Sequence, residues 1–167
     1  MVQSDQYARQ SYLSDECESY ARTASELSAV RASFETPAEH LVIADPASRL
    51  PSGPVVRHGD DNWADVVRWS VYALLAAEEL GVTSANVREM AASPVANPET
   101  NRLLGTEGQF GALLGLRPQW AVDAIAAGGN YGEIFERHIG ESTPVGIARG
   151  LNALWTRGGL QYTPPFR

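Results

Sequence analysis

Residues 54–81 read PVVRHGDDNWADVVRWSVYALLAAEELG, and within this stretch the sequence changes from strand-like to helical patterning. Its β-branched start, Val55 to Arg57, predicts a short strand. Asp60 or Asp61 then offers a side-chain oxygen that can cap a helix, and apolar residues recur three and four positions apart from there on. We therefore expect a long amphipathic helix that ends at Gly81 and buries one face.

After residue 60 the chain is predicted to be predominantly helical. Asn97-Pro98-Glu99 illustrates the start signal, with an Asn cap, a proline at the first helical position and an acidic residue in the first turn. Beyond Gly81, the expected helices cover about residues 85–92, 98–104, 107–114, 118–127 and 131–139, and a last helix opens at Thr143-Pro144 and is interrupted at Gly150.

Before residue 53, helix and strand signals alternate, which indicates an α/β segment. Helices are expected over residues 5–13 and 24–34, with Thr23 among the capping candidates of the second. Short strands are expected over residues 17–21 and 40–44, the latter an apolar run, HLVIA. Even with the strand described above, these elements are too few to complete a sheet. We therefore expect the chain to be part of a larger fold.

The composition limits the classes of function. The 167 residues are 44% apolar and 20% charged, as in a globular domain large enough to bury a core. Acidic residues outnumber basic ones by 20 to 13, so we expect no nucleic-acid partner. Every basic residue is an arginine, which excludes Schiff-base and Walker-type lysine chemistry. No signal peptide and no membrane helix is expected within this chain.

The sequence contains no catalytic, metal-binding or phosphate-binding motif, so we expect neither a metal nor a cofactor. Cys17 is the single cysteine, and its acidic neighbours favour a buried, unreactive thiol over a nucleophile. His58 precedes Asp60 and Asp61, which permits an acid–base pair or metal site, but a solvated turn followed by helix caps is the favoured interpretation. Glu78-Glu79 is interpreted as a solvated helix face and not as a cation site.

Several segments together resemble one family, the periplasmic solute-binding proteins of bacterial amino-acid ABC transporters, in particular the general L-amino-acid type of solute-binding family 3. The resemblance is specific from about Asp60 to the C-terminus, and it is weaker but collinear over residues 7–53. The segments that carry it are residues 54–69 (PVVRHGDDNWADVVRW), 77–87 (AEELGVTSANV), 128–137 (GGNYGEIFER), 149–160 (RGLNALWTRGGL) and 162–167 (YTPPFR).

The resemblance implies a fragment of the two-lobed, type II periplasmic-binding-protein fold, in which two α/β lobes are joined by two crossover strands and the amino acid lies in the cleft. Members of the family are about twice as long as this chain, which resembles their C-terminal half only. Residues 1–53 then correspond to the C-terminal part of lobe 2. Residues 54–167 correspond to the returning crossover and the C-terminal helical part of lobe 1.

The resemblance also implies one ligand-binding residue. In this family the anchor for the ligand carboxylate belongs to the N-terminal half, whereas the ammonium anchor is usually an Asp at the position that is Thr23 here. A neutral hydroxyl in place of a carboxylate would cost about 1–3 kcal/mol, or roughly ten- to a hundredfold in affinity. The alternative is that the correspondence slips by one residue, and Glu26 is the nearest carboxylate. The alternative role of Thr23 is a helix N-cap.

By resemblance, the chain is expected to be a non-enzymatic, truncated substrate-binding component that captures L-amino acids in the periplasm for permease subunits of an ABC transporter. Binding by this chain alone is expected to be weak or absent. A first alternative is a remnant helical interaction module without a small-molecule site, and a second is a hydrolase that uses His58, Asp60 and Asp61. We also expect self-association through unpaired sheet edges near Val42 and Val55.

Overall fold

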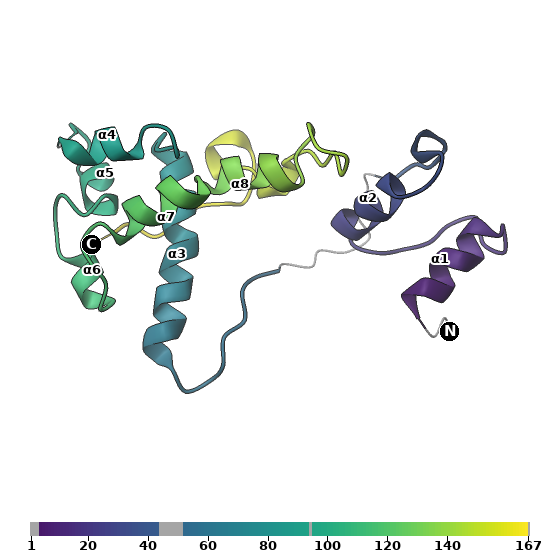
Figure 1. Cartoon of the computed structure of the whole chain (residues 1–167), viewed down its shortest axis with the longest axis horizontal. Coiled ribbons are helices and arrows are strands. Elements are labelled where there is room, and N and C mark those ends of the chain that lie inside the picture. The colour runs from purple at the N-terminus through teal and green to yellow at the C-terminus, as the bar shows by residue number, and fades with distance from the viewer. Residues whose placement is uncertain (1–3, 44–51, 94, 167) are drawn as a thin grey trace. The chain divides into compact units, whose positions relative to one another are not determined.

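The computed structural model describes residues 4–43, 52–93 and 95–166. The chain divides into two compact units, which we call unit 1 (Met1–Pro51) and unit 2 (Ser52–Arg167) and describe separately (Figure 1). Helices, turns and irregular segments make up the described residues of both units. An isolated parallel bridge between Leu154 and Gln161 is the one strand-type pairing found there.

Unit 1 contains two helices, α1 (Asp5–Leu13) and α2 (Ala24–Ala32), followed by the 3-10 turn η1 (Pro37–Glu39). Both helices begin where the sequence predicts. The Ser4 hydroxyl accepts a hydrogen bond from the Tyr7 N–H at 3.2 Å and so caps α1. An aromatic cluster joins the two helices to the segment after η1 and consists of Tyr12, Tyr20, Phe34 and His40.

The aromatic cluster has one polar contact at its centre. The Tyr12 hydroxyl and His40 Nδ1 are hydrogen-bonded at 2.7 Å, and the His40 and Phe34 ring centroids lie 4.5 Å apart. The Arg9 guanidinium covers the Phe34 ring at 5.3 Å from its centroid. These contacts fix how α1 and α2 face each other, because few aliphatic side chains are buried in this unit.

Unit 2 is organised around the long helix α3 (Asp61–Glu79), which has Leu80 as its C-cap. Gly81 follows this cap in the left-handed region, at φ +70°. Helices α7 and α8 lie across the C-terminal half of α3 (Figure 1). The other elements are α4 (Val87–Ala92), α5 (Pro98–Leu103), α6 (Phe110–Leu113), α7 (Trp120–Gly128), α8 (Tyr131–His138), η2 (Gly150–Asn152) and η3 (Trp155–Arg157). None of the helices in the described ranges has the length and apolar character needed to cross a bilayer.

The core of unit 2 forms where α3 presents small side chains. Ala73, Ala76 and Ala77 are buried, so the neighbouring helices approach α3 closely. Larger apolar side chains fill the remaining space, and they are Val82, Val87, Leu103, Leu104, Val122 and Ile125. Trp69 lies half-buried beside this core, with its ring centroid 4.4 Å from that of Phe110 and 5.2 Å from that of Phe166. Trp69 therefore serves to hold α6 and the C-terminal segment against α3.

The strands predicted over residues 17–21, 40–44 and 55–57 do not form in the described residues, and those predictions are wrong. Ala44, the last residue of the second stretch, lies outside the described residues. A strand requires a neighbour to complete its hydrogen-bond ladder, and among the described residues of unit 1 no backbone hydrogen bond joins residues 17–21 to residues 40–43. The predicted sheet edges near Val42 and Val55 are therefore exposed non-helical segments without strand pairing.

The predicted last helix from Thr143 is also wrong. The Thr143 hydroxyl donates back to the Gly140 carbonyl at 2.8 Å and closes a turn. Gly146 and Gly150 then adopt φ of +63° and +46°, and left-handed glycines interrupt a right-handed helix. Only the two short 3-10 turns η2 and η3 remain of the helical signal in this segment.

Candidate functional site

Thr23, the predicted ligand-binding residue, lies at the N-cap of α2. The Glu26 N–H donates to Thr23 Oγ1 at 3.3 Å, and the Thr23 N–H donates to Glu26 Oε2 at 3.2 Å, which together form a capping box. The Thr23 hydroxyl also donates to Glu26 Oε2 at 2.7 Å. The alternative role of Thr23 as a cap is therefore confirmed, whereas its role in ligand binding stays a prediction.

The same contacts place a charged group beside Thr23. Hydrogen bonds from the Thr23 hydroxyl and the Thr23 N–H hold the pKa of Glu26 below its usual range, with a smaller contribution from the nearby Arg22 guanidinium. The Glu26 side chain is exposed and thus carries a negative charge at neutral pH. The carboxylate that the sequence offered as nearest to Thr23 therefore contacts Thr23 directly.

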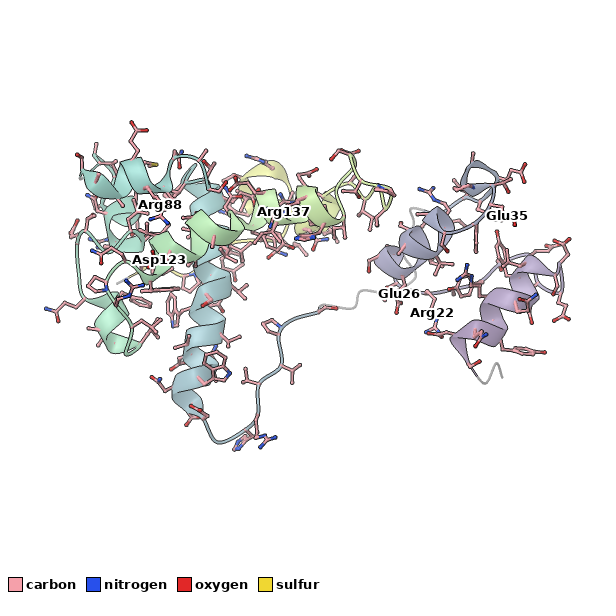
Figure 2. All side chains as sticks on the ribbon, viewed as in Figure 1. Arg22, Glu26, Glu35, Arg88, Asp123 and Arg137 are labelled. Atoms are coloured by element: carbon pink, nitrogen blue, oxygen red, sulfur yellow. The ribbon has the colours of Figure 1, made fainter. Side chains whose placement is uncertain are left out.

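Glu26 lines an open hollow of about 360 Å³ on unit 1 between α1 and α2. Figure 2 shows Arg22 and Glu26 at the start of α2. Arg22, which precedes the N-cap of α2, forms an ion pair with Asp5 of α1 and so links α1 to the start of α2. The lining residues are Asp5, Gln6, Arg9, Tyr20, Arg22, Glu26, Ala29 and Val30. Two guanidinium groups, two carboxylates and an aromatic ring therefore meet here, and such groups can bind either end of a zwitterion.

The other sequence candidates do not form a chemical site. The Asp60 carboxylate accepts a hydrogen bond from the Trp63 N–H at 2.9 Å and caps α3, and His58 is exposed in the preceding turn. This agrees with the favoured interpretation, a solvated turn at His58 followed by a helix cap at Asp60. Cys17 is a free, partly buried thiol. Among residues 4–43, 52–93 and 95–166, no three His, Cys, Asp or Glu side chains converge as metal ligands would.

Glu78 was predicted to lie on a solvated helix face, but its side chain is buried. Its side chain is 6% exposed and forms a bidentate ion pair with Arg149, with distances of 3.0 and 2.9 Å. The Arg149 guanidinium also lies 5.2 Å from the Tyr131 ring centroid and 5.1 Å from that of Phe135. Helical spacing provided a signal, because Glu78 follows Leu74 and Leu75 by four and three positions and so lies on the apolar face of α3.

A second open hollow, of about 400 Å³, lies on unit 2 and was not foreseen from the sequence. Its walls are Glu79, Trp155, Tyr162 and Thr163. The Trp155 indole N–H donates to Glu79 Oε1 at 2.9 Å. No sequence pattern relates the end of α3 to the C-terminal segment, since the two are about eighty positions apart and meet only in the folded unit.

The structure of a known protein identifies the class. The chain matches an ABC transporter periplasmic binding protein from Brucella ovis, solved with glutathione bound, with a TM-score of 0.90 and 47% sequence identity. The match covers 99% of this chain and 52% of that one. The chain therefore has the structure of about half of a periplasmic binding protein, which confirms the prediction of a fragment of that two-lobed fold.

Relatives known by sequence are named for binding amino acids. The chain is 52% identical to the glutamate/glutamine/aspartate/asparagine-binding protein BztA of Rhodobacter capsulatus over 99% of the chain and 49% of BztA. It is 49% identical to the general L-amino-acid-binding periplasmic protein AapJ of Rhizobium johnstonii over 93% of the chain and 46% of AapJ. No protein-family model matches. The chain is thus a homologue of the amino-acid-binding periplasmic proteins of ABC transporters, and it spans about half their length.

Proposed function

We propose that the chain is one half of the amino-acid-binding component of an ABC transporter and works in the periplasm. It captures L-amino acids and presents them to the permease subunits. One observation carries this proposal: nearly the whole chain is about 50% identical in sequence to proteins that are named for binding amino acids. These relatives are solute-binding proteins and not enzymes, in agreement with the sequence-based prediction. The helix-capping role of Asp60 also disfavours the hydrolase alternative.

In this proposal, the start of α2 contributes the anchor for the ligand ammonium group. Glu26 supplies the negative charge that a hydroxyl at position 23 lacks, and the two side chains are in contact at 2.7 Å. The Thr23 hydroxyl orients the Glu26 carboxylate and keeps it ionised. A charge-assisted hydrogen bond from an ammonium group to this carboxylate then fixes one end of the amino acid.

The proposal is tested by titration calorimetry with L-glutamate and a mixture of L-amino acids. For the chain alone, we expect weak heat or none. The chain is then coexpressed with the part of BztA that it does not span, and the purified complex is titrated in the same way. We expect saturable binding by the complex. Absence of binding by a folded complex would contradict the proposal and favour the alternative of a helical interaction module.

The anchor is tested with variants of the same complex. Glu26→Gln should weaken binding about tenfold or more, because Gln keeps the capping box but removes the charge. Glu35→Gln, at another exposed glutamate of unit 1, is the matched control and should bind normally (Figure 2). Adding Thr23→Asp to Glu26→Gln should restore affinity, whereas adding the neutral cap Thr23→Asn should not. Equal affinity for all four variants would contradict the proposed anchor.

A further inference from the structure

Four large apolar side chains are exposed together on the C-terminal segment of unit 2. We call Leu151, Trp155, Leu160 and Tyr162 the C-terminal patch, and each is between 44% and 70% exposed. The Leu160 N–H donates to the Leu151 carbonyl at 2.9 Å, so these two residues are neighbours. Trp155 and Tyr162 line the same hollow. The patch therefore consists of two pairs of neighbouring apolar side chains on one segment, and exposed apolar side chains that gather in this way are typical of binding surfaces.

Backbone hydrogen bonds link the turns of the segment that presents the patch. The Trp155 N–H donates to the Gln161 carbonyl at 2.9 Å, and the Gln161 N–H donates to the Ala153 carbonyl at 3.1 Å. Gly159 closes this loop so tightly that a Cβ atom there would lie 1.8 Å from the Ala153 carbonyl oxygen. Because the backbone that carries these side chains is already ordered, it loses little conformational entropy when a partner binds.

Both ends of the segment are anchored to α3. Arg149 joins its beginning to Glu78 through the buried ion pair. The buried ring of Phe166 joins its end to Trp69. The Trp155 indole and Glu79 add a polar contact beside the patch. These anchors give the patch the apolar centre and polar edge that are typical of a protein–protein interface.

We infer that the C-terminal patch is the docking surface for a polypeptide equivalent to the part of the relatives that this chain does not span. The inference rests on the proposed function. The chain matches 52% of an intact binding protein at a TM-score of 0.90, so its structure is that of a molecule in which the other half is present. The relatives provide that half as about as many residues again. We expect the C-terminal patch to be covered in an intact protein of this fold and exposed in the chain alone.

The inference is tested by coexpressing the tagged chain with the untagged complementary part of BztA, followed by affinity capture and size-exclusion chromatography. We expect a 1:1 complex. Leu160→Ser combined with Tyr162→Ser should reduce the captured complement at least tenfold, because two apolar contacts are removed from the interface. Leu113→Ser, at an exposed leucine on α6 outside the patch, is the matched control and should leave capture unchanged.

Thermal unfolding of each variant alone separates loss of docking from loss of folding, and Trp155→Phe is a milder second variant that should weaken capture several-fold. Unchanged capture by the folded double variant would overturn the inference. A second outcome would also overturn the inference: the chain alone forms a dimer, and the same two substitutions abolish that dimer. The patch would then bind a second copy of the chain. A complex that depends on the patch but binds no amino acid would support the docking surface and contradict the proposed function.

Discussion

At the scale of single residues, charged side chains that the sequence leaves undistinguished have very different surroundings. Glu78 and Glu79 are adjacent, yet the first is buried against Arg149 and the second is exposed beside Trp155. Gly132 shows how closely α8 approaches the buried pair, because a Cβ atom there would lie 2.9 Å from the Glu78 carboxyl carbon. The stability of unit 2 should therefore depend strongly on a few of its charged residues.

Arg149→Met should destabilise unit 2 by about 3–5 kcal/mol, because it leaves the buried Glu78 carboxylate without its main partner. The Arg157 guanidinium, 3.7 Å from Glu78 Oε1, compensates only in part. Urea denaturation measures the effect. Arg117→Met is the control, since Arg117 pairs with Asp123 at an exposed site and its loss should cost less than about 1 kcal/mol. Equal effects of the two substitutions would contradict the prediction.

Glu133 should make the stability of unit 2 depend on pH. Burial raises the pKa of Glu133, but hydrogen bonds from the Ser84 hydroxyl and from the Asn130 and Ser84 N–H groups outweigh that effect and hold it below its usual range. A lowered pKa in the folded state means that the stabilisation is present above the unfolded value, about pH 4.3, and is lost as the pH falls through the folded value.

Glu133→Gln should accordingly cost about 1 kcal/mol at pH 7, a modest figure because the carboxylate is only partly buried. The difference from the parent chain should shrink as the pH falls below about 4.3. Urea denaturation of both proteins across this range is the measurement. Glu141→Gln, at an exposed position, should follow the parent at every pH. A difference that persists unchanged into acid would exclude the ionised carboxylate as its source.

At the scale of elements, the helices could be predicted because their signals are local. Thr23, Asp60 and Asn97 were among the expected helix caps, and each of these side chains accepts a hydrogen bond from a backbone N–H at the start of its helix. The strands could not be predicted, because a β-branched sequence forms a strand only beside a partner. The hollow between α1 and α2 was also missed, since it depends on side chains from both helices.

The capping box of α2 should have a measurable effect on unit 1. Thr23→Ala removes the hydroxyl that accepts from the Glu26 N–H, so it should cost about 1 kcal/mol and shorten the helix at its start. Thr23→Ser keeps the hydroxyl and is the matched control. Far-UV circular dichroism during urea unfolding measures both. If the alanine and serine variants unfold at the same urea concentration, the cap contributes nothing to unit 1.

At the scale of the whole molecule, the sequence predicted a fragment, and the comparisons agree in that the chain spans about half of each relative. The assignment of residues 1–53 to lobe 2 and residues 54–167 to lobe 1 stays a prediction, as does the correspondence to the C-terminal half. The expectation that unpartnered apolar segments lead to self-association also stays a prediction. Its structural basis is Leu41, Ile43 and Val55, which are 74–94% exposed.

The chain alone should therefore self-associate as its concentration rises, since exposed apolar side chains on non-helical segments favour association. Sedimentation velocity over a range of concentrations measures this. Leu41→Ser combined with Ile43→Ser should weaken the association, whereas Leu113→Ser should not, although Leu113 is also exposed. A chain that stays monomeric at all concentrations would contradict the expectation.

The buried ion pair of Arg149 also affects how the folded chain is digested. Trypsin cleaves after lysine and arginine, and this chain contains only arginine. The Arg149 side chain is 16% exposed and held by Glu78, whereas the Arg157 side chain is 67% exposed. Brief digestion should thus cut after Arg157 and spare the bond after Arg149 until unit 2 opens. Appearance of the fragment that begins at Gly150 would then report local opening of the ion pair.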